Sequence, residues 1–202
     1  MSASAVHRLS DIAVAVCWGL VALVWIAGAV YNVRRSPDVE RRSRAGTPWI
    51  LAAAVVWIVV RFTPTSDWDA ITTHSSVVRL AGVVLLVGFT AFTLWARVAL
   101  GTMWSSSAVA KSHHELRTDG PYAITRHPIY TGLVGMLLGT ALAVGLGVYA
   151  VLVVLGVLFA EVKIHAEEQL LGDVFPVAYA EYRRNVPQLV PGLRLGRGRR
   201  RG

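Results

Sequence analysis

The chain contains runs of apolar residues that are long enough, or nearly so, to cross the hydrocarbon core of a membrane as helices. The first run, residues 12–30, reads IAVAVCWGLVALVWIAGAV, and a spanning helix needs about 20 such residues. Further apolar runs cover residues 48–62, 77–96, 129–146 and 148–164. Because backbone polar groups cannot stay unpaired in hydrocarbon, such segments must be helical. The sequence therefore predicts an all-α integral membrane protein with about five transmembrane helices in a single domain.

Composition excludes the other classes to which a basic chain could belong. Of the 202 residues, 54% are hydrophobic and 16% are charged, which is too apolar for a soluble domain of this size. The formal net charge is +8, but the arginines lie between and after the apolar runs and form no patch interleaved with aromatic residues. We therefore expect the lipid bilayer, with its anionic headgroups, to be their partner, and no nucleic acid. The single cysteine, Cys17, lies inside the first run and is expected to be a small buried hydrophobe.

The distribution of arginine predicts an orientation. Arginine is frequent in residues 31–47, 97–128 and 192–202, whereas residues 63–76 contain two aspartates and neither lysine nor arginine. With five spans, the three basic segments fall on one side of the membrane. Since positively charged loops stay in the cytoplasm, the N-terminus is predicted to lie outside the cell membrane. The basic tail and the polar segments 97–128 and 165–191 are then cytoplasmic.

The helix of the fifth run is predicted to continue beyond its apolar part. The first residue expected to terminate it is Gly172, so about two turns project from the membrane. Lys163 and Glu167 are four residues apart and share a face of this helix. Glu168 lies about 100° further round the helix, so we expect its side chain to point elsewhere and to matter less than that of Glu167.

A second, shorter helix is predicted to follow. Asp173 is expected to cap it, and Pro176 suits its first turn. Apolar and aromatic residues recur along it at helical spacing, and we expect this stripe to fold back on the membrane-proximal site. A stripe of this kind is more often core than part of a cofactor site. Its members are Phe175, Tyr179, Tyr182 and Val186.

The chemistry of the chain is concentrated in one long polar stretch between apolar runs and in an acidic pair that follows the fifth run. The polar stretch, residues 114–130, reads HELRTDGPYAITRHPIY, and the acidic pair is Glu167 and Glu168. Polar side chains packed at the entry of a membrane span usually mark a functional site. The patterns are His114-x-Leu116-x-Thr118-x-Gly120-Pro121-Tyr122, Arg126-His127-Pro128-x-Tyr130-x-Gly132, Glu167-Glu168-x-x-Leu171 and Phe175-x-x-x-Tyr179-x-x-Tyr182.

In combination these patterns, which extend over roughly residues 97–191, resemble the isoprenylcysteine carboxyl methyltransferases and their phospholipid methyltransferase relatives. The resemblance implies an integral membrane enzyme that uses S-adenosyl-L-methionine on the cytoplasmic side, under a cover of C-terminal helices. It also implies a lipophilic or prenylated methyl acceptor. Position by position, it implies cofactor contacts from His114, Glu115, Leu116, Arg117, Tyr122, His127, Pro128, Ile129, Tyr130 and Glu167.

The residue types themselves favour this cofactor. S-adenosylmethionine presents a carboxylate, an ammonium group, a sulfonium and an adenine, so its site needs donors, anions and apolar or aromatic walls. Arg117, Arg126, Glu167, the tyrosines and the backbone N–H groups at the start of the fourth span could supply this set. The sequence has no Gly-x-Gly-x-x-Gly pattern between a strand and a helix, which excludes a methyltransferase of the Rossmann type.

The candidate catalytic residues are Arg126, Tyr130 and Lys163. The eukaryotic enzymes of the family have a substrate-side arginine where this chain has Lys163. Lys163 could neutralise an anionic acceptor head, or it could be a snorkelling anchor at the membrane surface. We find no Ser-His-Asp or Cys-His constellation, and an activated methyl group needs no protein nucleophile. We therefore expect direct transfer to an amphiphilic acceptor whose tail enters from the bilayer, between the third and fourth spans.

Three other interpretations were weighed. His165 with Glu161 and Glu168 could begin a metal site on one helix face, but the spans supply no further ligands, so we predict no metal. Arg97 is interpreted as a positive anchor at the membrane surface and not as a site residue. The alternative function is a non-catalytic membrane module, for lipid binding or assembly, that retains the fold. The sequence does not indicate an oligomeric state.

Overall fold

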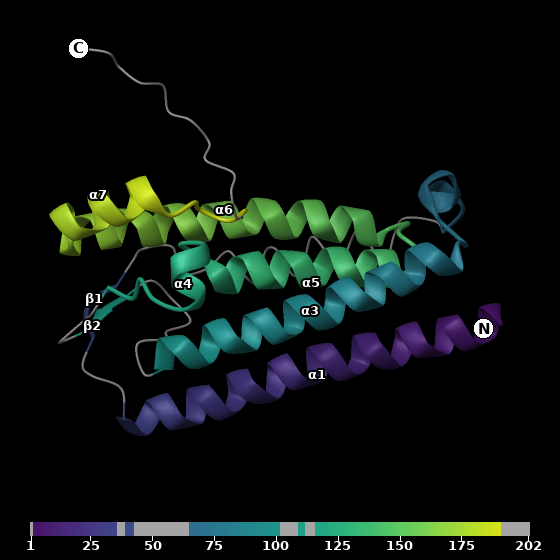
Figure 1. Cartoon of the computed structure of the whole chain (residues 1–202), viewed down its shortest axis with the longest axis horizontal. Coiled ribbons are helices and arrows are strands. Elements are labelled where there is room, and N and C mark those ends of the chain that lie inside the picture. Colours follow the sequence, from purple (N-terminus) through teal and green to yellow (C-terminus); the bar gives the residue numbers. More distant parts are fainter. Residues whose placement is uncertain (1, 36–38, 43–64, 102–108, 112–115, 191–202) are drawn as a thin grey trace, which may run out of the picture.

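Long helices lie side by side along the long axis of the molecule, in the order α1, α3, α5 and α6 (Figure 1). The computed structural model describes residues 2–35, 39–42, 65–101, 109–111 and 116–190. Its long helices are α1 (Ala3–Arg35), α3 (Ser76–Leu100), α5 (Pro128–Val144) and α6 (Tyr149–Val174). The predicted second span, residues 48–62, lies outside the described residues.

Short elements gather at the two ends of the bundle. The 3-10 helix η1 (Thr65–Ile71) lies at the same end as the start of α1 (Figure 1). The opposite end holds α4 (Pro121–Ile124), α7 (Pro176–Asn185) and the strands β1 (Val39–Arg42) and β2 (Val109–Lys111). Described parts of the first two basic segments, residues 39–42, 109–111 and 121–124, therefore lie at one end, whereas the basic tail lies outside the described residues. Which end faces the cytoplasm stays a prediction.

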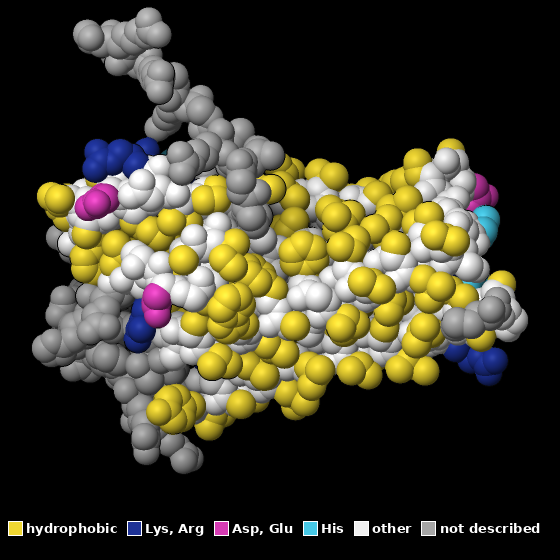
Figure 2. All heavy atoms as spheres, viewed as in Figure 1, with side chains coloured by type: hydrophobic (Ala, Val, Ile, Leu, Met, Phe, Trp, Pro, Cys, Tyr) yellow, Lys and Arg dark blue, Asp and Glu magenta, His cyan; other side chains and the backbone are white. Residues whose placement is uncertain are grey.

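Within the described ranges, three helices are long and apolar enough to cross a membrane: Ala3–Tyr31, Ser76–Leu100 and Tyr149–Val174. The apolar helix α5 is shorter, with 17 residues. Side chains such as Ile12, Leu23 and Leu158 are more than half exposed along the flanks of α1 and α6. Figure 2 shows hydrophobic side chains along the sides of the bundle and charged ones at its ends. This is the surface of an integral membrane protein, because apolar flanks are stable only against lipid.

Two boundaries differ from the sequence predictions. Gly172 does not end α6, which continues to Val174, and Phe175 then lies at the junction with α7. Asp173 therefore belongs to α6, and it cannot cap α7 as we predicted, whereas Pro176 does begin that helix. The physical reason is that Pro176 removes a backbone donor and disfavours helical geometry in the residue before it, which is a stronger stop than a glycine.

The first basic segment is also more ordered than the predicted solvated loop. Helix α1 continues to Arg35, and Val39–Arg42 pairs antiparallel with Val109–Lys111. Both segments leave the bundle at the same end, so their unpaired backbone groups can satisfy each other. The small sheet joins the first loop to the segment that precedes the polar site.

Glycines bring α3 and α5 into close contact. A Cβ atom on Gly132, Gly135 or Gly139 of α5 would overlap Thr93, Phe89 or Leu86 of α3, respectively. Small residues repeated along one helix face allow this approach in membranes, where packing and not hydrophobicity drives association.

The first helix packs on the α3–α5 pair through a small apolar core. Cys17 and Val21 of α1 pack with Leu86 and Met136, and the indole of Trp18 donates a hydrogen bond of 3.0 Å to the Thr140 hydroxyl. The prediction that Cys17 is a buried hydrophobe is confirmed.

Gly139→Ala should destabilise the protein by about 1–3 kcal/mol, as overpacking does in well-packed cores. The new Cβ atom would lie 2.6 Å from the backbone nitrogen of Leu86, and backbone cannot move aside cheaply. The measurement is the thermal unfolding midpoint in detergent. Gly88→Ala on α3 is the matched control, because no atom lies within 4 Å of its Cβ position. Equal midpoints for the two variants would contradict the close approach.

Candidate functional site

The polar residues of the predicted site meet where the α4–α5 turn faces the end of α6. Arg126 and His127 form the turn, with His127 as the N-cap of α5 and Pro128 as its first residue. Tyr130 lies in the first turn of α5, and Glu167 and Glu168 lie on the polar part of α6. Proline suits the first helical turn because its missing N–H would be unpaired there anyway. The local sequence therefore fixes where α5 starts and aims three side chains at α6.

Glu168 binds both cations of the turn. Its Oε1 atom accepts hydrogen bonds from Arg126 Nη2 at 2.6 Å and Arg126 Nε at 3.0 Å, and it lies 3.3 Å from His127 Nε2. The expectation that Glu168 points away from the site is therefore wrong. Successive residues on a helix diverge by about 100°, but the turn lies between the two glutamates and reaches both.

Glu167 binds the other side of the same histidine. Its Oε1 atom accepts a hydrogen bond of 2.7 Å from the Tyr130 hydroxyl, and its Oε2 atom lies 3.6 Å from His127 Nδ1. The side chain of Glu167 is 29% exposed, against 16% for Glu168, 8% for Arg126 and 4% for His127. Glu167 is thus the carboxylate that a ligand can reach, whereas Glu168 is mostly buried and hydrogen-bonded to Arg126 and His127.

His127 is held as a cation. Its burial alone would lower its pKa, but its contacts with the carboxylates of Glu167 and Glu168 outweigh burial and raise the pKa above the ordinary value of 6.5. Each ring nitrogen faces one carboxylate, and only the protonated imidazole can donate from both. With Arg126, the turn contributes two positive charges against two negative charges from α6.

The C-terminal segment after α7 covers the turn through its backbone. The N–H groups of Arg126 and His127 donate to the carbonyls of Pro187 at 2.8 Å and Gln188 at 3.2 Å. The hydroxyl of Thr125 donates to Gln188 O and that of Thr131 to Leu189 O, both at 2.7 Å.

Arg126 itself extends this cover. Besides binding Glu168, its Nη1 atom donates to the carbonyl of Val186 at 2.7 Å and to that of Arg183 at 3.3 Å. Arg126 therefore ties α6 to the end of α7.

Tyrosines fill the space between the turn and α7. Tyr179 and Tyr182 are buried, and the Tyr182 hydroxyl donates a hydrogen bond of 2.6 Å to the backbone carbonyl of Tyr122. The prediction that this stripe folds back on the site is confirmed for both. Burial first and then the charge of Glu167 raise the pKa of Tyr122.

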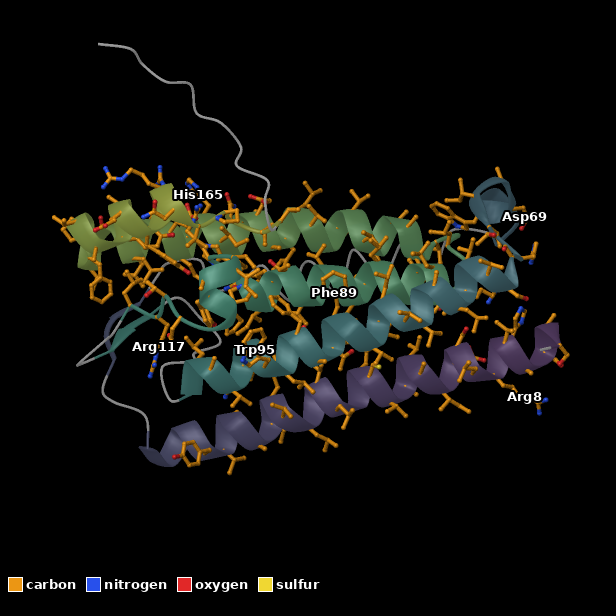
Figure 3. The ribbon with its side chains drawn as sticks, in the orientation of Figure 1. Arg8, Asp69, Phe89, Trp95, Arg117 and His165 are labelled. Atoms are coloured by element: carbon orange, nitrogen blue, oxygen red, sulfur yellow. The ribbon has the colours of Figure 1, made fainter. Side chains whose placement is uncertain are left out.

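The structure brings together some of the predicted site residues and leaves others apart. His127, Pro128 and Tyr122 are buried at the turn, and Lys163 is buried one helical turn before Glu167. Leu116 and Ile129 are half-buried, whereas Arg117 is exposed (Figure 3). His114 and Glu115 lie outside the described residues.

Sequence reasoning missed Thr125, Thr131 and Gln188, which bind the cover to the turn. No spacing rule singles out such residues, because the hydroxyls of Thr125 and Thr131 donate to backbone carbonyls about 60 residues away, and Gln188 takes part through its own carbonyl. The position of Thr125 directly before the Arg126-His127 pair was the one available signal. His165, weighed as a metal ligand, contacts Gln169 at 3.0 Å (Figure 3).

The raised pKa of His127 makes part of the stability depend on pH. The histidine contributes its full stabilisation below its ordinary pKa of 6.5, and this contribution is lost as the pH rises through the higher value of the folded state. His127→Gln should therefore lower the melting temperature most near about pH 6 and progressively less towards about pH 9. His165→Gln, at an exposed histidine of α6, is the control. A His127→Gln deficit that stays constant with pH would contradict a protonated His127.

Comparisons with known proteins relate the part of the chain that carries this site to a family of membrane methyltransferases. Residues 80–173 match the model of the isoprenylcysteine carboxyl methyltransferase family. The cobalt-zinc-cadmium resistance protein CzcN of Cupriavidus metallidurans is 36% identical over 101 residues, which are 49% of this chain and 46% of that protein. A protein-S-isoprenylcysteine O-methyltransferase of Schizosaccharomyces pombe is 37% identical over 100 residues, which are 48% of this chain and 42% of that protein. The alignments thus span less than half the length of each of these two relatives.

A solved structure has the same fold. The eukaryotic intramembrane Ras methyltransferase ICMT superposes with a TM-score of 0.57 at 22% sequence identity, over 74% of this chain and 54% of that one. The match confirms the helical membrane fold that the apolar runs predicted. Residues 80–173 are thus similar to the isoprenylcysteine carboxyl methyltransferase family, and the chain shares the fold of the solved methyltransferase.

Proposed function

We propose that the protein transfers a methyl group from S-adenosyl-L-methionine to an amphiphilic acceptor in the membrane. The observation that carries this proposal is the partly exposed carboxylate of Glu167, fixed by Tyr130 and His127 at the polar end of apolar helices. An isoprenylcysteine carboxylate is the acceptor we favour, because a named relative acts on isoprenylcysteine. A related lipid or thiol is the broader class.

The described residues fit this cofactor. An accessible anion supported by two neighbours suits an ammonium group, and the buried aromatic ring of Tyr122 on α4 suits an adenine or a thioether. Within the described part of the chain, no group of three histidine, cysteine or acidic side chains could hold a metal ion. We propose contacts from His114, Glu115, Leu116, Arg117, Tyr122, His127, Pro128, Ile129, Tyr130 and Glu167.

The residues of this chain then have separate tasks. When bound, S-adenosylmethionine supplies a methyl group already activated on a sulfonium. Glu167 binds positive charge, Tyr130 holds Glu167 in place, and Arg126 keeps the cover closed through the carbonyls of Arg183 and Val186. These tasks need no nucleophilic side chain, and they position the reactants and limit the access of water.

Lys163 is proposed to receive the acceptor's anionic head. It is buried on α6, four residues before Glu167 and on the same face. A buried ammonium near the end of an apolar helix favours a carboxylate neighbour over a neutral group. Because glycines pack α5 directly against α3, the predicted entry of the acceptor's tail between the third and fourth spans is wrong. The tail would instead remain in the bilayer beside the apolar flanks of the bundle.

The acceptor is tested by transfer of labelled methyl groups with purified protein in lipid. A prenylated cysteine carboxylate and the same cysteine derivative without its prenyl chain form the matched pair. The prenylated compound should have a kcat/KM at least about tenfold higher, because its apolar chain is held by the bilayer and the helices. Equal kcat/KM values for the two compounds would contradict a membrane acceptor and indicate a water-soluble one.

Glu167→Gln should weaken cofactor binding about ten- to a hundredfold, because the variant keeps the hydrogen bond from Tyr130 but loses the charge. Calorimetry with S-adenosylmethionine measures the effect. Glu181→Gln, at an exposed position of α7, is the control for removing an acidic charge at the same end of the molecule. An unchanged Kd for Glu167→Gln would contradict the proposal that Glu167 binds the cofactor.

A further inference from the structure

The guanidinium of Arg97 lies against α1 at a point where that helix has no side chain. Arg97 lies in the last turn of α3 and is 5% exposed. A Cβ atom built on Gly28 of α1 would overlap Arg97 Nη2 and would lie 2.9 Å from Cζ and 3.3 Å from Nε. Any residue other than glycine at position 28 would therefore occupy space that the guanidinium now fills.

Arg97 in turn lies near an element of the proposed cofactor site. Its Nη1 atom donates to the carbonyl of Gly101 at 3.2 Å, which holds the side chain at the end of α3. The end of α3 that carries Arg97 packs against the start of α4, since a Cβ atom on Gly120 would lie 3.7 Å from the ring of Trp95. Gly28 of α1 and Arg97 of α3 thus lie next to the helix that carries Tyr122.

We infer that Gly28 is a positioning residue: its missing side chain provides the space, here called the seat, that holds the Arg97 guanidinium at the end of α3 next to α4. The sequence prediction of Arg97 as a simple surface anchor does not explain its burial against α1. Gly28 lies outside residues 80–173, so the family match carries no information about it. Through this seat the first helix contributes to a site whose proposed cofactor contacts all lie after α3.

The seat is expected to affect function more than stability. The atom that a Cβ on Gly28 would meet first is the end of a long, flexible side chain and not backbone. Gly28→Ala should therefore push the guanidinium out of the seat while α1 and α3 stay packed. This behaviour differs from that of Gly139, where backbone blocks the new methyl group.

The coupling to the site rests on the proposed cofactor binding and is tested by the Kd for S-adenosylmethionine. Gly28→Ala should raise this Kd about fivefold or more, as coupled neighbours do, with the melting temperature nearly unchanged. Gly19→Ala on the same helix is the control, because nothing lies within 4 Å of its Cβ position. Lysine lacks the Nη2 atom, so in the Arg97→Lys background Gly28→Ala should change the Kd less than about twofold. An unchanged Kd in Gly28→Ala, or the same effect in both backgrounds, would overturn the positioning role.

The seat itself is tested without the cofactor. Gly28→Leu exceeds what a shifted guanidinium can accommodate and should lower the melting temperature more than Gly19→Leu. Arg97→Ala should relieve this loss by leaving space. If the changes in melting temperature caused by Gly28→Leu and Arg97→Ala are additive in the double variant, the proposed seat is wrong. Failure of the wild-type protein to bind S-adenosylmethionine would overturn the proposed function and the coupling to it, while the stability cycle still decides the seat.

Discussion

The neutral arrangement of four charged groups at the α4–α5 turn is the interaction on which the rest of the site depends. Removing a charge from water costs several kcal/mol or more unless it is paired and hydrogen-bonded. Arg126 and His127 are almost fully buried, so they require the two carboxylates of α6. The polar end of α6 is thereby fixed relative to the start of α5.

Helix α6 relies on this network because the apolar packing it makes in the described structure is modest. The buried residues of α6 there are Ala160, Lys163 and Ile164, whereas α3 and α5 interlock through glycines along much of their length. Close packing therefore joins α3 to α5, whereas ion pairs and hydrogen bonds join α6 to the start of α5. The partly exposed Glu167 lies at the edge of this charged network.

The sequence predicted the elements of this structure better than the roles of their residues. Apolar runs located α1, α3, α5 and α6, because an apolar segment in lipid must pair its backbone groups within a helix. Pro128 and Pro176 marked the starts of two helices. The partner of Glu168 could not be predicted, because helix periodicity describes the direction of a side chain but not the position of the turn that meets it. The seat of Arg97 was equally hidden, since it depends on an absent side chain in a helix about 70 residues away.

The turn binds the cover through the backbone carbonyl groups of the cover and hardly at all through its side chains. Val186, Pro187, Gln188 and Leu189 each present a backbone oxygen to the turn, and every residue type has that oxygen. The side-chain donors of the turn, Thr125, Arg126 and Thr131, are the residues whose identity these hydrogen bonds require. Residues 186–189 can thus change in sequence while the cover stays closed, because the hydrogen bonds that hold it do not depend on their side chains.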